Sequence, residues 1–121
     1  KKKLFGKKVI WTNSGKISCN YSPIEFAKIA EDQGAGEIII QSIERDGKMS
    51  GYDIELIKEV SRSVTIPVVA LGGAGSVKDL YEAKQLGNAN ALAAGSMFVF
   101  QGSRKGVLIN YPEVDELSSL R

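Results

Sequence analysis

The sequence predicts an α/β domain made of four successive βα units. Apolar runs without polar alternation, which are typical of strands buried on both faces, recur along the chain, and amphipathic segments of helical spacing separate them. The expected strands are 8–11, 37–40, 67–71 and 91–94. Their starts lie roughly 24 to 30 residues apart, which is the length of one βα unit.

Hydrophobic spacing and capping residues predict the helices. The expected helices are 23–33, 53–64 and 76–86. The first carries a proline in its first turn, and the other two begin at residues favoured as N-caps, Asp53 and Ser76. The segment from Gly102 onwards is interrupted by Pro112, so its last residues are either a short terminal helix or a tail.

Four βα units in 121 residues fit two architectures. One is a small open doubly wound sheet, and the other is half of an eight-fold barrel, which typically takes about 250 residues. A half barrel exposes a strand edge on each side and one face of its apolar core. We therefore expect it to pair with a missing half or to form a homodimer through its open sheet edges.

Composition excludes several classes of function. The 16 Lys and Arg residues against 14 Asp and Glu give a net charge of +2, too balanced for binding nucleic acid or an anionic membrane. With no histidine and a single cysteine, Cys19, we expect no disulfide framework, no Ser–His or Cys–His pair, no metal and no cofactor. The apolar runs are too short for a membrane span or a signal peptide, so we expect a cytoplasmic protein.

The loops after the third and fourth expected strands carry a candidate phosphate site, because ligands of α/β folds bind at the carboxyl ends of strands. Gly-Gly-Ala-Gly at 72–75 follows the third strand, and Gly95-Ser96 follows the fourth. Small residues let backbone N–H groups approach an anion, so these two loops predict a shared phosphate site. The alternative is an ordinary tight turn and a helix start.

The loop after the second expected strand, 41–53, is long and polar, which favours a functional role. Asp46 is its candidate acid or base, and Gly47 can present its amide to a phosphate. The alternative is that the loop charges are merely solvated. Glu37 lies at the opposite, amino-terminal end of the same strand, where a carboxylate usually serves stability or a buried ion pair.

Several motifs, taken together and in order, resemble the cyclase subunit of imidazole glycerol phosphate synthase. They are Gly-Ala-Gly-Glu-Ile at 34–38, Ser-Ile-Glu-Arg-Asp-Gly at 42–47, Ser-Gly-Tyr-Asp at 50–53, Ile-Pro-Val-Val-Ala at 66–70, Gly-Gly-Ala-Gly at 72–75 and Ala-Ala-Gly-Ser-Met-Phe at 93–98. The resemblance runs from about Val9 to Phe100. It implies that residues 1–121 are four βα units forming the C-terminal half of a (βα)8 TIM barrel, matching barrel strands five to eight, and that the N-terminal half is absent from this chain.

The resemblance also implies an activity. Members of this family are ammonia-dependent lyases of histidine biosynthesis, which convert a bisphosphorylated aminoimidazole carboxamide ribonucleotide into imidazole glycerol phosphate and an aminoimidazole carboxamide ribotide. Ammonia arrives through the barrel from a glutaminase partner.

The position of each residue in these motifs implies which role of the family it would have. The residues implied to hold one substrate phosphate are Gly72, Gly73, Gly95 and Ser96. Gly47 would help to hold the other phosphate, and Asp46 would lie beside the substrate as the catalytic candidate. Glu37 matches the carboxylate of the gate through which ammonia enters, an assignment that outranks the structural one.

Departures from the family pattern qualify this reading. The family's two catalytic aspartates, on the first and fifth strands, fall outside this sequence, so we expect the chain alone to be inactive. Gln41 stands where the family usually has Thr, and Leu71 where it usually has Ser, both in the substrate pocket. These departures resemble a paralogous branch that channels ammonia for acetamidino modification of lipopolysaccharide or flagellar sugars, and this non-cyclase role is the alternative hypothesis.

Overall fold

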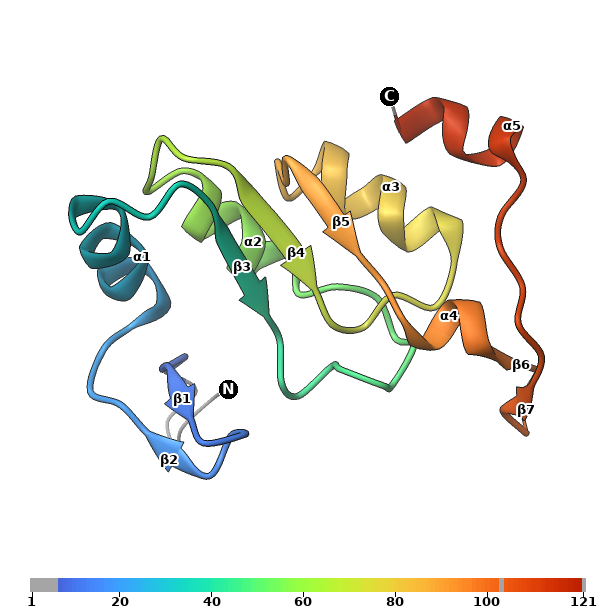
Figure 1. Cartoon of the computed structure of the whole chain (residues 1–121), viewed down its shortest axis with the longest axis horizontal. Coiled ribbons are helices and arrows are strands. Elements are labelled where there is room, and N and C mark those ends of the chain that lie inside the picture. The colour runs from blue at the N-terminus through green and yellow to red at the C-terminus, as the bar shows by residue number, and fades with distance from the viewer. Residues whose placement is uncertain (1–6, 103, 121) are drawn as a thin grey trace.

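The computed structural model describes residues 7–102 and 104–120, built around a three-stranded parallel sheet. The strands are β3 (Ile38–Gln41), β4 (Val68–Leu71) and β5 (Ala91–Ala93), in the order β3-β4-β5. Ile38 lies opposite Val68, and Val69 lies opposite Ala91. Because each connection returns the chain to the same end of the sheet, all three strands end at one edge (Figure 1). The expected α/β class with parallel strands is confirmed.

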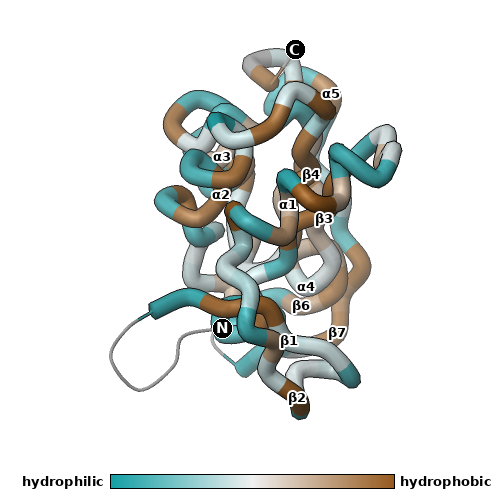
Figure 2. Tube along the Cα trace, turned by 90° about the vertical axis from the view of Figure 1, so that its left-hand side faces the viewer, coloured by the Kyte–Doolittle hydropathy of each residue, from teal (hydrophilic) through white to brown (hydrophobic). Residues whose placement is uncertain are grey.

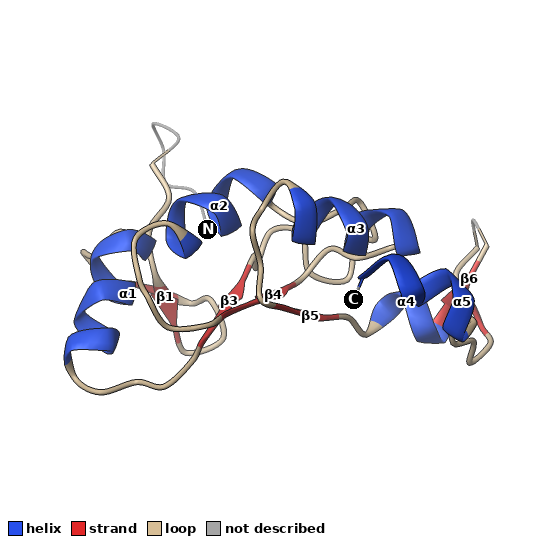
Figure 3. Cartoon of the chain, turned by 90° about the horizontal axis from the view of Figure 1, so that it is seen from above, coloured by secondary structure: helices blue, strands red, loops and turns tan. Residues whose placement is uncertain are grey.

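Three helices connect and flank these strands. They are α1 (Pro23–Asp32), α2 (Ile54–Ser61) and α3 (Val77–Gln85). Viewed from above, α2 and α3 lie along one face of the sheet (Figure 3). The other face carries exposed apolar residues, among them Ile39, which is 61% exposed to solvent. The sheet is thus covered by helices on one face only.

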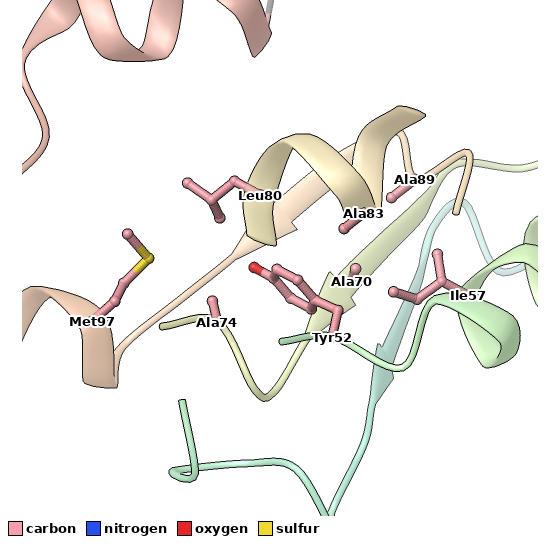
Figure 4. Close-up of a cluster of buried hydrophobic side chains, with 8 residues drawn as sticks. All are labelled: Tyr52, Ile57, Ala70, Ala74, Leu80, Ala83, Ala89 and Met97. Atoms are coloured by element: carbon pink, nitrogen blue, oxygen red, sulfur yellow. The ribbon is translucent and has the colours of Figure 1, made fainter. Parts of the chain in front are cut away.

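The core lies between the sheet and α2 and α3. Val68 and Ala70 of β4 are fully buried and pack toward the helices. Along the Cα trace, α2 and α3 alternate between hydrophobic and hydrophilic residues, as helices with one buried side do (Figure 2). Tyr52, which precedes α2, inserts its ring among Ala70, Ala74 and α3 (Figure 4).

The expected N-caps are confirmed. The side chain of Asp53 accepts a hydrogen bond from the amide of Leu56, and Ser76 forms a capping box with Asp79. Helix α2 ends three residues before the expected Val64, because the Ser63 amide and hydroxyl both bond to the carbonyl of Val60 and close a tighter turn.

The first expected strand, 8–11, does not join the parallel sheet, and that part of the prediction is wrong. Instead β1 (Trp11–Thr12) pairs antiparallel with β2 (Ile17–Ser18). The amide of Ile10 donates to the carbonyl of Tyr21, and its carbonyl accepts from the amide of Cys19, so both backbone groups of Ile10 bond to the returning chain. The described sheet consequently has three parallel strands rather than four.

The chain after β5 forms a short helix, a hairpin and a terminal helix. These elements are α4 (Ser96–Val99), β6 (Phe100–Gln101), β7 (Gly106–Val107), α5 (Val114–Leu117) and the 3-10 helix η1 (Ser118–Leu120). Of the two alternatives for the last segment, the terminal helix is confirmed, whereas the β6–β7 hairpin was not predicted. None of the helices in the described ranges is long and apolar enough to cross a membrane.

Candidate functional site

A hollow opens at the carboxyl ends of the three parallel strands, where their loops meet. Its lining residues are Asp46, Gly47, Leu71, Gly72, Gly73, Ala74, Ala94, Gly95 and Ser96. We call this the glycine hollow. It brings together all five residues predicted to bind phosphate, although they come from three loops, and it adds Asp46 and Leu71 to them. The resemblance assigns Gly47 to a different phosphate from the other four, but here it lines the same hollow.

Glycine is required where the loop after β3 touches the loop after β4. Gly73 has φ +109°, a backbone conformation that other residues rarely adopt, and a Cβ atom there would lie 2.2 Å from the carbonyl oxygen of Gly51. The amide of Gly51 in turn donates a 2.8 Å hydrogen bond to the carbonyl of Gly73. The two loops therefore pack backbone against backbone, which no side chain at position 73 would allow.

Several backbone amides of the hollow remain open to a ligand. The carboxylate of Asp79 accepts hydrogen bonds of 2.9 Å from both Gly75 and Ser76, so these two amides are already satisfied. Within residues 7–102 and 104–120, the amides of Gly73, Gly95 and Ser96 donate no hydrogen bond. N–H groups without acceptors at the rim of a hollow are the donors that an anion binds.

The two polar residues predicted beside the substrate contact each other. The Gln41 side-chain amide donates a 3.0 Å hydrogen bond to the carboxylate of Asp46, and both side chains are exposed. A turn holds Asp46 in place, since its amide donates to the carbonyl of Ser42. Leu71, at the end of β4, adds an apolar wall to the hollow. The carboxylate is thus available to solvent at the rim.

Two residues that sequence reasoning missed hold the Asp46 loop in place: Tyr52 ties it to β5, and Arg45 ties it to itself. The hydroxyl of Tyr52 donates to the carbonyl of Ala93 at 2.9 Å, and burial raises the pKa of Tyr52 to about 12. Arg45 donates from one guanidinium nitrogen to the carbonyls of Ser50 and Gly51, both at 3.2 Å. The role of Tyr52 has no local signal, because its partner lies 41 residues away, whereas Arg45 bonds to carbonyls five and six residues along its own loop.

Glu37 is not brought to this hollow. It lies just before β3, at the end of the strand opposite to Asp46, and it is exposed. It takes part in none of the ion pairs of the described ranges, so the expectation of a buried ion pair is wrong. In the same ranges, no three His, Cys, Asp or Glu residues gather as metal ligands would.

A second, wider hollow adjoins the first on the bare side of the sheet. It is lined by the β1–β2 turn, residues 11–15, together with Gln41, Ile43 and Asp46. Asp46 lines both hollows and is the residue that they share.

Comparison with known proteins gives a consistent result. The family model described as "Histidine biosynthesis protein" matches residues 2–104. The chain is 40% identical over 117 residues to a Pseudomonas aeruginosa protein named "Putative imidazole glycerol phosphate synthase subunit hisF2", covering 97% of this chain and 47% of that protein.

Two further relatives carry the same activity in their names. The imidazole glycerol phosphate synthase subunit HisF of Chlorobaculum parvum is 45% identical over 100 residues, covering 83% of this chain and 40% of that protein. The HisF subunit of Hyphomonas neptunium is 50% identical over 91 residues, covering 75% of this chain and 36% of that protein. The chain therefore spans less than half the length of these relatives.

Proposed function

The chain belongs to the histidine biosynthesis protein family, and on that premise we propose that it supplies half of an imidazole glycerol phosphate synthase cyclase. In the complete barrel this activity is an ammonia-dependent lyase reaction on a bisphosphorylated aminoimidazole carboxamide ribonucleotide. The names of the relatives support this function and do not favour the glycan alternative.

One observation carries the proposal: the glycine hollow offers open amides at the place where a phosphate is expected. Gly73, Gly95 and Ser96 present N–H groups without acceptors, and Gly47 and Gly72 complete the lining. We assign all five residues to one phosphate group of the substrate, because they share one hollow. The absence of bulky side chains lets the phosphate reach the backbone.

Asp46 is the proposed acid or base of this half. Its carboxylate borders both hollows, so it lies beside a substrate whose phosphate occupies the glycine hollow. Gln41 and Leu71 shape the pocket around it, Gln41 by its hydrogen bond to Asp46 and Leu71 by its apolar side chain. Chemistry on the substrate then takes place at the carboxyl ends of the strands, beside the glycine hollow.

The remaining half of the barrel and the source of ammonia are proposed partners. A sheet with helices on one face and exposed apolar residues on the other fits a half barrel, 1–121, whose open face is covered by a second set of βα units. Glu37 and Asp46 lie at opposite ends of β3, so ammonia delivered by a glutaminase at the Glu37 end would travel along the strand to reach the substrate.

The test joins the chain to the upstream half barrel of a relative and supplies excess ammonium with the bisphosphorylated ribonucleotide. We expect loss of the substrate, monitored by its absorbance, and we expect Gly73→Ala to lower the turnover per folded molecule, with the folded fraction taken from urea unfolding of the same variant. Gly36→Ala is the matched control, because a Cβ atom at Gly36 meets nothing within 4 Å. Phosphate binding without turnover in the restored barrel would contradict the cyclase assignment.

A further inference from the structure

The glycine hollow has an unbalanced charge. Among its nine lining residues the ionisable one is Asp46, which is acidic. A phosphate monoester carries about 1.5 to 2 negative charges at neutral pH, so it would repel this carboxylate at close range. Backbone amides bring only partial charges to offset the repulsion. A cation near the rim would therefore strengthen the binding of phosphate considerably.

The β6–β7 hairpin brings a lysine to that rim. Lys105 lies in the turn before β7, and its ammonium donates a 3.1 Å hydrogen bond to the carbonyl of Gly47, 58 residues earlier in the chain. An ammonium has three N–H donors, so the bond to Gly47 leaves two for another acceptor. Lys105 lies beyond the residues matched by the family model, which end at 104.

The hairpin is attached firmly to the hollow. It follows α4 directly, and α4 begins at Ser96, one of the lining residues (Figure 1). The chain leaving the hairpin returns along α4, with the amide of Leu108 bonded to Val99 and that of Asn110 bonded to Phe98, both at 2.9 Å. These bonds fix the base of the hairpin relative to Ser96.

We infer that Lys105 is a phosphate-binding residue that completes the glycine hollow from the Gly47 side. The inference rests on the proposed function, since it takes the hollow to be a phosphate site. The lysine supplies the full positive charge that the lining lacks, and its contact with Gly47 holds the loop carrying Asp46 and Gly47 against the hairpin. It acts by binding the substrate, and the acid or base chemistry remains with Asp46.

The experiment measures the Kd of inorganic phosphate for the full chain by calorimetry, at low and high salt. We expect Lys105→Met to raise the Kd about fivefold or more at low salt and Lys105→Arg to restore most of the binding. Lys28→Met is the matched control: Lys28 is an exposed lysine of α1, so its loss changes net charge equally while leaving the hollow untouched. The difference between the two variants should shrink as salt screens the ammonium.

The outcomes separate the two proposals. Equal phosphate affinity of the parent chain and Lys105→Met overturns the role of Lys105 and leaves the hollow as a phosphate site. An equal rise in Kd for Lys28→Met also overturns it, because net charge would then explain the effect. A parent chain that binds no phosphate removes the site itself and with it this inference. Circular dichroism of each variant confirms that the exposed substitutions leave the fold intact.

Discussion

The side chains of Gln41 and Asp46 are joined by a hydrogen bond of 3.0 Å at the rim of the glycine hollow. One carboxylate oxygen of the proposed acid or base is therefore occupied by an amide. Gln41, one of the two expected departures from the family pattern, thus contacts the residue that carries the proposed chemistry.

Replacing Gln41 by Thr should raise the turnover of the restored barrel. The shorter side chain cannot reach Asp46 as the amide does, so the carboxylate loses this bond and can turn toward the substrate, and the pocket gains room. We expect kcat to increase about threefold or more, within the range of one hydrogen bond to a charged group. Gln33→Thr, at the exposed end of α1, serves as the control. Unchanged kcat for Gln41→Thr would show that the bond has no effect on catalysis.

Replacing Gly73 by Ala should destabilise the fold itself. The added Cβ atom meets the Gly51 carbonyl at 2.2 Å, and φ at this position is +109°. We expect the free energy of unfolding to fall by about 2 kcal/mol, as measured in urea. Gly36→Ala should change it little, because the same atom there has open space. Similar unfolding curves for both variants would mean that the loops of Gly51 and Gly73 can move apart without lowering the free energy of unfolding.

Removing the hydroxyl of Tyr52 should loosen the attachment of the Asp46 loop to β5. In Tyr52→Phe the carbonyl of Ala93 loses its 2.9 Å donor, and we expect a loss of about 1 kcal/mol in the free energy of unfolding. Tyr81→Phe is the control, since Tyr81 is 45% exposed. Equal stability of the two variants would rule out the hydroxyl as a structural tie.

The same tyrosine predicts a dependence on alkaline pH. Burial raises the pKa of Tyr52 to about 12, above its value in the unfolded chain, so the native state favours the neutral phenol. The contribution of the neutral Tyr52 phenol to the free energy of unfolding is complete below about pH 10 and is lost as pH rises toward 12. Urea unfolding between pH 9 and 11 should show a steeper loss of stability for the parent chain than for Tyr52→Phe. Parallel curves would contradict the raised pKa.

Glu31 predicts a dependence on acid pH. Its carboxylate accepts hydrogen bonds from the Thr65 hydroxyl and amide, at 2.6 and 2.7 Å, which lower the pKa of Glu31. The stabilisation is present above the unfolded pKa and is lost as pH falls through the lower native value. Glu31→Gln should therefore flatten the loss of stability between pH 5 and 3, whereas Glu59→Gln, on the exposed side of α2, should leave its slope unchanged.

The sequence alone was sufficient to predict those elements whose signal lies in neighbouring residues. Apolar runs of strand length identified β3, β4 and β5, and capping side chains identified the starts of α2 and α3 at Asp53 and Ser76. Because parallel strands joined by helices end at one edge, their order in the chain was enough to place the glycine loops together. The meeting of the Gly72–Gly73 and Gly95–Ser96 loops was therefore predictable, whereas the place of Gly47 in the same hollow was not.

Tertiary structure decided what depends on contacts between distant residues. The apolar run at 8–11 has the composition of a strand, but the backbone of Ile10 bonds to Cys19 and Tyr21 of the returning chain. The run is therefore not part of the parallel sheet. The partners of Tyr52 and Lys105 lie 41 and 58 residues away, and no nearby residue indicates them. Local propensities determine which elements form, whereas the packing of loops determines which backbone groups stay open, and that second choice defines the candidate site.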